Sequence, residues 1–410
     1  MNFTRLNCIA FILANACLFF GTAFSVSAQD APPFRLGIIG TNTSHVPAFV
    51  ELFNNPKAGG AYARYEIVGA YKGGMPDNDS SWGRTNKIAS EIEAKGVKIY
   101  PTIEELLKNV DGVLLEEVDA RPHLEYASQV IAAKKPMFID KPAAGCLEDV
   151  LAIYNMAQEQ NVPIFSASTL RYSSSLVEAQ SGKWGAIQHV EAWSPHHPAP
   201  GVPELYFYGI HAVDPLFALM GSGCVSVSRT SSPSCECVVG VWKDGRIGIA
   251  RAIARDKSNY GFFLYGSKGD VVSGKYDGYK LLGDALCRFF DTGKPDFDSA
   301  ETIEIFAFMT AADQSKALNS QTVLIADTIQ QAKNREVKTF RLIIKADKTL
   351  TLNGEAVTPD QATKTFNSKT ENQLYRVVVS KDAAVEQSYV NEEILPLLKN
   401  VYFAGYYESL

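Results

Sequence analysis

Short apolar runs alternate with amphipathic segments between residues 34 and 168, and this alternation predicts an α/β domain. The apolar runs have the length of buried strands, and the segments between them repeat apolar residues at helical spacing. We expect strands at 36–39, 65–71, 97–100, 111–116, 137–140 and 162–165, and helices at 46–54, 88–94, 102–107, 123–133 and 147–160. Strands that alternate with helices form a parallel sheet with right-handed crossovers. Residues 34–168 are therefore predicted to be a Rossmann-like, doubly wound domain.

The pattern changes near residue 171, after which apolar runs follow one another closely. These runs lie at 189–194, 225–231, 237–242, 247–254 and 261–265, and some of them are separated by short turns. Closely spaced runs of this kind predict a mostly antiparallel sheet. Helical patterns follow at 279–291 and 299–319. Residues 169–336 are therefore predicted to be a second α+β domain.

The last segment, residues 337–410, is predicted to be a small α+β extension. Residues 340–352 alternate like one strand, and Asn353-Gly354 is a turn signal. We expect a helix at 358–367, a strand at 374–380 and a helix at 391–399.

The N-terminus resembles a secretory signal. Arg5 precedes an apolar run at 6–24, and Val26-Ser27-Ala28 fits a small-residue cleavage site. We therefore expect residues 1–28 to be removed and the mature chain to be periplasmic or extracellular. The alternative is an uncleaved membrane anchor, because the run is close to spanning length. No other segment is apolar enough to span a membrane.

Composition and charge narrow the function classes. The 410 residues are 46% hydrophobic and 20% charged, which is ordinary for a globular protein. A formal net charge of −6 and the lack of a basic run argue against a nucleic-acid surface.

Five cysteines remain after the leader, and their spacing is not that of a disulfide scaffold. Cys224 could pair with Cys235 or Cys237 in an oxidising compartment. Cys235 and Cys237 could instead bind a metal, or all five could be free thiols. The sequence leaves these three alternatives open.

The stretch 35–45, RLGIIGTNTSH, joins the first strand to the first helix through a glycine turn. Gly37 and Gly40 leave room at the strand end, and a helix N-terminus that follows such a turn suits a dinucleotide pyrophosphate. The fingerprint G-x-G-x-x-G would need glycine at 42 and 45, where the chain has Asn42 and His45. Asn42 narrows the approach to a phosphate, and His45 crowds the helix against the strand. A nucleotide site and an ordinary turn both remain open.

Lys72 ends the second strand, where dinucleotide folds have an acid that binds the ribose hydroxyls. A lysine there suits a 2′-phosphate, which favours NADP slightly over NAD. An exposed loop lysine is the alternative. Export in an unfolded state argues against any bound dinucleotide, because such a chain cannot carry one with it.

Several separated motifs resemble the glucose–fructose oxidoreductase / inositol dehydrogenase / MocA (Gfo/Idh/MocA) family, over residues 35–323. The resemblance rests on the segments GIIG, VDGVLLEEVDARPHLEYASQVIAAKKPMFIDKPAA, GIHAVDPLFALMG and DTGKPDFDSAETIEIFAFMTAADQSKAL. It implies a Rossmann domain, a family sheet domain through which the chain could form a homo-oligomer, and NAD(P)-linked oxidation or reduction of sugars or polyols. It places cofactor contacts at Gly37, Gly40, Thr41, Asn42, Lys72, Glu116 and His123.

Two residues are implied to be catalytic. Asp140-Lys141-Pro142 stands where the family has Glu-Lys-Pro, with a proline that is cis in the family, so Lys141 is expected to bind substrate and assist proton transfer. His211 lies in the family's G-x-H-x-x-D segment and is expected to be the general acid or base. The alternatives are a surface lysine after a strand and a structural histidine bonded to Asp214.

One family carboxylate is missing, because Phe207 stands where many members have an aspartate. Glu116 and Glu117 end the fourth strand close to the expected nicotinamide. They could replace the missing carboxylate or repel a cofactor, and the sequence does not decide between these.

Substrate contacts are expected at the domain junction, from Asp140, Arg171, Trp193, His197 and Asp214. Exposed loop residues are the alternative for Trp193 and His197. A metal site built from the histidines at 196, 197 and 211 is not predicted, because adjacent residues of an extended chain point to opposite sides.

Two hypotheses follow. The first is an exported oxidoreductase that uses NAD or NADP on a sugar or polyol. The second is a catalytically degenerate or redox-neutral relative that binds carbohydrate in the cell envelope. Retention of Lys141 and His211 favours an active site of some kind.

Overall fold

The computed structural model describes residues 32–255, 259–274, 276–370 and 372–408. The predicted signal peptide, residues 1–28, lies outside the described residues. Within the described ranges, no helix is both long enough and apolar enough to cross a bilayer.

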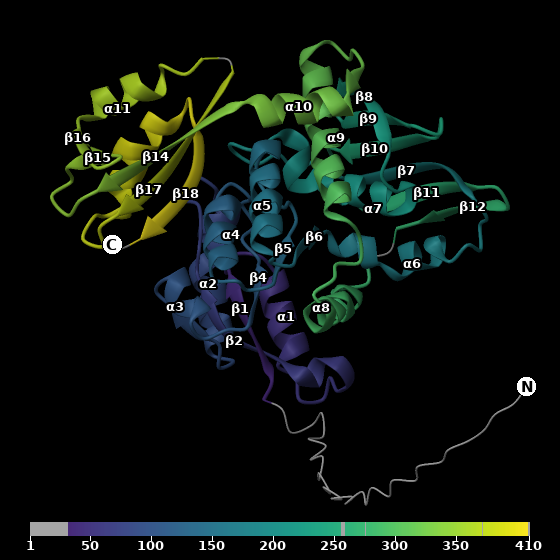
Figure 1. The fold of residues 1–410 in the computed structure, drawn as a ribbon, viewed down its shortest axis with the longest axis horizontal. Coiled ribbons are helices and arrows are strands. Elements are labelled where there is room, and N and C mark those ends of the chain that lie inside the picture. The colour runs from purple at the N-terminus through teal and green to yellow at the C-terminus, as the bar shows by residue number, and fades with distance from the viewer. Residues whose placement is uncertain (1–31, 256–258, 275, 371, 409–410) are drawn as a thin grey trace, which may run out of the picture. The chain divides into compact units, whose positions relative to one another are not determined.

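Six parallel strands form the first sheet, in the order β3-β2-β1-β4-β5-β6 (Figure 1). They are β1 (Phe34–Ile39), β2 (Tyr65–Tyr71), β3 (Lys98–Tyr100), β4 (Gly112–Leu115), β5 (Met137–Asp140) and β6 (Ile164–Ala167). This strand order is that of a Rossmann fold. The predicted doubly wound domain is confirmed.

Helices cover both faces of this sheet. One face packs against α1 (His45–Phe53), α2 (Asp79–Glu93) and the later helix α8 (Lys280–Thr292). The other face packs against α3 (Ile103–Leu107), α4 (His123–Ala132) and α5 (Leu147–Gln160). Within β1, Leu36 and Ile38 point to the first face and Ile39 to the second, so the apolar alternation of the strand follows its burial on both sides.

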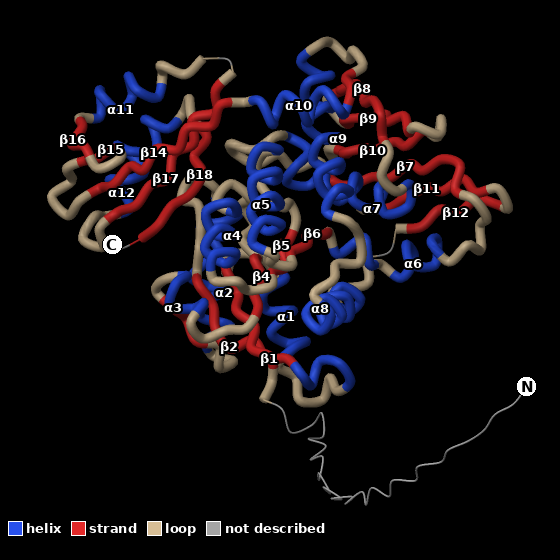
Figure 2. The backbone as a smooth tube through the Cα atoms, viewed as in Figure 1, coloured by secondary structure: helices blue, strands red, loops and turns tan. Residues whose placement is uncertain are grey.

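The second sheet has seven strands in the order β12-β11-β7-β10-β9-β8-β13 (Figure 2). They are β7 (Ile187–Pro195), β8 (Cys224–Ser232), β9 (Cys235–Trp242), β10 (Ile247–Ile253), β11 (Gly261–Gly266), β12 (Gly269–Ser273) and β13 (Val323–Leu324). All neighbours are antiparallel except β7 and β10. The sheet is therefore mixed but mostly antiparallel, as expected.

Helices of the second unit pack on one face of this sheet. They include α7 (Ile210–Met220) and α9 (Ser299–Ala317), and α6 (Ser174–Gln180) and α10 (Ile325–Asn334) lie nearby.

The strand register shows whether Cys224 can form a disulfide with Cys235. Cys224 pairs with Trp242 and Cys235 with Ser232, so these thiols lie at opposite ends of the β8–β9 hairpin. All five described cysteines are free thiols.

The third sheet has the order β16-β15-β14-β17-β18. Its strands are β14 (Glu336–Ile344), β15 (Leu350–Leu352), β16 (Glu355–Val357), β17 (Gln373–Lys381) and β18 (Tyr402–Glu408), with α11 (Pro359–Phe366) and the short α12 (Gln387–Tyr389) packed beside them. The predicted single strand 340–352 is wrong. A turn interrupts it, in which Asp347 accepts hydrogen bonds from the backbone and hydroxyl of Thr349.

The predicted helix 391–399 is also wrong in type. Two short non-α turns, Val390–Ile394 and Leu395–Leu398, take its place. Pro396 lies at the start of the second turn, where it removes a backbone donor. β18, which follows, was not predicted. The predicted domain boundaries at 168 and 336 stay predictions.

The third sheet packs on the Rossmann unit. Arg376 of β17 forms a buried ion pair with Asp149 of α5, and the Tyr407 and Tyr126 rings lie 5.9 Å apart. Trp82 of α2 contacts Tyr406 at 5.6 Å between ring centroids. The extension therefore touches the same helix that lies over the ends of β1 and β2.

Candidate active site

A cavity of about 540 Å³ lies between the carboxyl ends of the Rossmann strands and the second sheet unit. Ligands of open α/β sheets bind at this edge. The cavity, called the cleft below, is lined by Thr43, Ser44, His45, Ser80, Arg84, Val118, Lys141, Thr169, Leu170, His197, Pro198, Phe207, Tyr208, His211, Tyr260, Tyr276 and Tyr279. It therefore brings together three residues predicted from sequence, namely Lys141, His197 and His211.

Lys141 follows β5 directly and precedes a cis peptide bond to Pro142, as the resemblance implied. Its side chain is 7% exposed, and its ammonium lies 5.9 Å from the Phe207 ring centroid and 5.7 Å from that of Tyr208. Burial lowers the pKa of Lys141, and the carboxylates of Asp140 and Glu116 oppose the shift. The neutral amine that a general base requires is therefore more accessible than in water.

His211 lies near the start of α7. Its Nδ1 is 2.8 Å from the hydroxyl oxygen of Ser168, and its ring packs against Tyr208 and Tyr260. Burial lowers the pKa of His211 well below its ordinary value, and Lys141 and His45 lower it further. The ring is therefore neutral near pH 7. When Nδ1 donates to Ser168, Nε2 is left as an acceptor for a substrate proton.

Arg171 and Asp214 do not line the cleft, and their expected role as substrate contacts stays a prediction. Asp214 accepts hydrogen bonds from the Ser168 backbone N–H at 2.7 Å and from Arg171 Nε at 2.9 Å. Arg171 also pairs with Glu301 at 2.6 Å. These two residues hold Ser168, and through it His211, in position. Arg171 has two carboxylate partners because a buried guanidinium needs them in place of water.

Trp193 is likewise outside the cleft lining. Its ring packs over Gly261, and its Nε1–H donates to Asn259 at 3.4 Å. His197 does line the cleft, with its ring 4.7 Å from that of Tyr208. The structure thus separates two residues that the sequence placed together.

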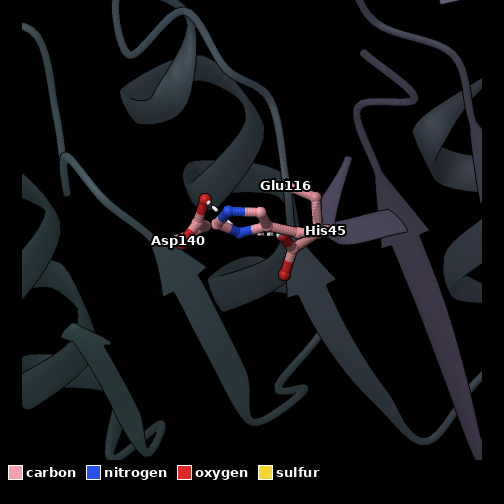
Figure 3. Close-up of side chains that lie close together, drawn as sticks. All are labelled: His45, Glu116 and Asp140. Atoms are coloured by element: carbon pink, nitrogen blue, oxygen red, sulfur yellow. Dashed lines mark ion pairs between the residues drawn. The ribbon is translucent and has the colours of Figure 1, made fainter. Parts of the chain in front are cut away.

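His45 was not predicted to act in catalysis, but it lies in the wall of the cleft. It is the first residue of α1, and its ring lies 4.6 Å from that of Tyr279. Figure 3 shows it between Glu116 and Asp140, with Nδ1 2.9 Å from Asp140 Oδ2. Burial alone would raise the pKa of Asp140, but His45 and Lys141 lower it below its ordinary value. Asp140 therefore contacts His45, and its expected role as a substrate contact stays a prediction.

Two residues expected at a cofactor are structural. Gly37 lies inside β1, where an added Cβ would meet Val110 and Leu106 at 3.0–3.1 Å. His123 is fully buried, with Nε2 2.8 Å from the Glu117 carbonyl and Nδ1 3.2 Å from that of Ala143. Gly37 lets β1 pack closely against Leu106 and Val110, and His123 ties two loops together, while their expected contacts with a cofactor stay predictions.

A second cavity, of about 480 Å³, lies at the carboxyl ends of β2 and β3. Lys72 lines it and donates to Asn86 at 3.1 Å. The C-terminal extension supplies Lys381, Tyr406 and Glu408 to the same wall. In Rossmann folds a dinucleotide lies along this edge, with its adenosine end near the second strand. The two cavities therefore lie at the positions where the two ends of an extended dinucleotide would lie.

Glu117 is next to both linings: it precedes Val118 of the cleft, and a Cβ added at Gly73 of the second cavity would lie 2.5 Å from Glu117 Oε2. Its buried carboxylate accepts hydrogen bonds from Gly74 N–H at 2.8 Å and from Asn42 Nδ2 and Ser81 Oγ, each at 2.7 Å. Gly40, at φ +93°, packs so closely that an added Cβ would lie 2.4 Å from Glu117 Cα. Burial raises the pKa of Glu117 to about 7, although the hydrogen bonds from Ser81 and Asn42 lower it.

Helix α2 completes the partition. Ser80 and Arg84 face the cleft, whereas Trp82, Thr85 and Asn86 line the second cavity. Thr41 fixes the helix by donating its hydroxyl to the Thr85 carbonyl at 3.1 Å. In this structure a carboxylate already takes these donors, so a bound pyrophosphate would have to displace Glu117 from them. The side chains of Thr41 and Asn42 thus form hydrogen bonds to Thr85 and Glu117 in this structure.

Residues 34–168 match the family described as "Oxidoreductase family, NAD-binding Rossmann fold" (GFO_IDH_MocA). This part of the chain thus resembles the NAD-binding domain of the Gfo/Idh/MocA oxidoreductases. Among curated proteins, the chain is 26% identical over 227 residues to the uncharacterized oxidoreductase YhhX of Escherichia coli strain K12. That match spans 50% of this chain and 65% of YhhX, less than two thirds of its length.

Solved structures of an inositol dehydrogenase and of another oxidoreductase share the fold. A myo-inositol dehydrogenase from Lactobacillus casei, solved with NAD(H) and myo-inositol, is 16% identical with a TM-score of 0.57. The match covers 71% of this chain and 96% of that one. An oxidoreductase from Thermotoga maritima is 17% identical with a TM-score of 0.58, over 72% and 99% of the two chains. At these identities the likeness establishes the fold.

Proposed function

We propose that this chain is an oxidoreductase that acts on a carbinol or carbonyl carbon of a sugar or polyol in the cleft. The observation that carries the proposal is the convergence of Lys141 and His211, from different units, on one aromatic-walled cavity. NAD(P), when bound, would accept or supply the hydride. The family relation of residues 34–168 supports this choice of cofactor.

The chain's own residues supply the proton transfer. Lys141, with its lowered pKa, orients a substrate hydroxyl and takes or returns its proton. His211, held by Ser168, acts on the same hydroxyl or on its neighbour. The rings of Phe207, Tyr208 and Tyr260 offer faces against which the C–H side of a sugar packs.

A redox-neutral reaction at the same residues is the second candidate. Glu117 favours it, because this carboxylate lies in the path that a pyrophosphate would take. The signal-like N-terminus points the same way if the chain is exported unfolded and without cofactor. Proton transfer next to a carbonyl needs only the acid–base residues of the cleft.

The two candidates are separated by one experiment on the mature chain. A panel of hexoses, inositols and sugar acids is incubated in D₂O with NAD⁺, with NADP⁺ or without cofactor, and products are followed by proton NMR and by NAD(P)H absorbance. Cofactor-dependent loss of a carbinol proton supports the oxidoreductase. Deuterium incorporation or rearrangement without cofactor supports the redox-neutral reaction.

We also propose that the open face of the second sheet joins two copies of this chain. Val241, Ile247 and Tyr265 are exposed on its strands, by 37–42%. Such apolar residues gather at interfaces. A charged substitution, Tyr265→Lys, is expected to reduce the mass measured by light scattering, and an unchanged mass contradicts the interface.

A further inference from the structure

Four buried polar atoms without a hydrogen-bond partner gather at one place, the cluster of His45, Glu116 and Asp140 below the cleft wall (Figure 3). They are His45 Nδ1, both carboxylate oxygens of Glu116, and Asp140 Oδ1. His45 Nδ1 lies near Asp140 Oδ2, but the contact lacks hydrogen-bond geometry. Buried polar groups are nearly always satisfied, so such a concentration calls for a missing partner.

Glu116 makes the strongest case. Glu116 follows β4 directly, and its side chain is 0% exposed to solvent. Burial of an unpaired carboxylate is very costly, so the group must either stay protonated or bind a cation. Among the described residues, no ion pair joins Glu116 to Lys141. Among the ion pairs of the described residues, Glu116 takes part in one, in which His45 Nδ1 lies 3.7 Å from Glu116 Oε2.

The arrangement has the dimensions of a metal site. One ligand atom from each of the three residues lies within 4.8 Å of the others, and the two measured separations from Nδ1 are 2.9 and 3.7 Å. Ligands held at about 2.1 Å from one ion are themselves roughly 3–3.7 Å apart. An imidazole with two carboxylates suits divalent transition metals such as Zn²⁺ and Mn²⁺.

We propose that His45, Glu116 and Asp140 bind one divalent transition-metal ion beneath the cleft. The ion would neutralise the two carboxylates and satisfy the partnerless oxygens of Glu116. It would also fix the His45 ring in the cleft wall, next to Lys141. This site is independent of the substrate and of the dinucleotide, so it can be tested without an activity assay.

A second cluster of the same composition provides a matched control. His196, Glu204 and Glu236 also lie within 4.8 Å of one another. Their carboxylates, however, are already paired with protein cations: Arg229 Nε lies 2.7 Å from Glu236, and Lys316 Nζ lies 2.7 Å from Glu204. This cluster has no need of a metal ion, and Glu204→Gln is expected to leave metal binding unchanged.

The test uses the mature full-length chain, first treated with a chelator. Zn²⁺ and Mn²⁺ are titrated by calorimetry, and Co²⁺ is added as a spectroscopic probe. We expect one ion per chain, Co²⁺ absorption bands from a bound ion, and a rise in Tm on metal addition. Glu116→Gln should weaken binding at least about tenfold, since loss of an outer partner alone costs about 10–100-fold.

Stability measurements distinguish a metal ion bound at Glu116 from a proton held by Glu116. Without metal, Glu116→Gln should be at least as stable as the wild type, because it removes a buried ionisable group. With metal, only the wild type and Glu204→Gln should gain stability. If Glu116→Gln does not fold, Asp140→Asn replaces it. Absence of metal binding by the wild type, or equal binding by Glu116→Gln, would overturn the proposal and leave Glu116 as a buried neutral acid.

Discussion

The side-chain amide of Asn42 donates a hydrogen bond of 2.7 Å to the carboxylate of Glu117, across the space between two cavities of the Rossmann edge. Asn42 stands at the second glycine position of the dinucleotide fingerprint, and Glu117 comes from the end of β4. The pair shows how a chain can keep the strand order of a Rossmann fold while one of its own carboxylates takes the donors at this turn.

Replacing Glu117 tests this relationship. At a pH above about 7, where Glu117 is ionised, Glu117→Ala frees the Gly74 N–H and the Asn42 amide and removes a negative charge, so it is expected to bind NAD(H) or NADP(H) at least about tenfold more tightly than the wild type. Tryptophan fluorescence measures the affinity. Glu105→Ala, an exposed acid on α3, serves as the control and should change nothing. Equal affinity of Glu117→Ala and wild type would contradict the blocking role.

Glu117 also predicts a pH dependence of stability. Its pKa is raised to about 7 in the folded chain, so the folded state holds a proton that the unfolded state releases at lower pH. The stabilisation is complete below the unfolded pKa and is lost as pH rises through about 7, by up to about 1.4 kcal/mol per pH unit. Urea unfolding at several pH values should therefore show a slope in the wild type that Glu117→Gln lacks. Parallel curves would show that Glu117 does not hold this proton.

His211 predicts the acid limb of the activity profile. Its pKa is lowered by burial and by Lys141, so the neutral ring persists below the ordinary histidine pKa of about 6.5. The rate should therefore fall only at a lower pH than that value. Ser168→Ala removes the contact to Nδ1 and is expected to lower kcat and move this limb, with little effect on KM. An unchanged profile would mean that Ser168 does not position the ring.

The buried pair of Asp149 and Arg376 predicts how the extension is held. Arg376→Met leaves the fully buried carboxylate of Asp149 without its partner, which should cost about 3–5 kcal/mol of unfolding free energy. The double variant Asp149→Leu, Arg376→Met removes both buried charges, so it should recover much of the lost unfolding free energy. Denaturant unfolding measures both, and equal stability of the single variant and wild type contradicts the assignment.

The sequence allowed us to predict those residues whose role depends on the short segment in which they lie. Lys141 and His211 were found because each lies in a short segment that resembles a motif of the family, so a stretch of a few residues was enough to single them out. Gly40 was also found, because its positive φ is a property of one turn. The doubly wound parallel sheet was predicted from the alternation of strands and helices.

Residues that act through distant partners were missed or misassigned. Glu117 meets Ser81, whose helix begins earlier than predicted because its first turns are polar and show no apolar period. His45 was interpreted as crowding, since the two carboxylates around it come from β4 and β5. Arg171 was assigned to substrate because nothing near it in sequence reveals Asp214 and Glu301. Such pairings arise only from the tertiary fold.

The most direct measurement compares Lys141→Ala with the wild type on the first sugar or polyol that the D₂O panel shows to react. Loss of a group that assists proton transfer should reduce kcat by about 10²–10⁴-fold, while the far-ultraviolet spectrum and the thermal unfolding curve stay those of a folded chain. A Lys141→Ala variant that turns over the same substrate at the wild-type rate would contradict the assignment of the cleft as the active site.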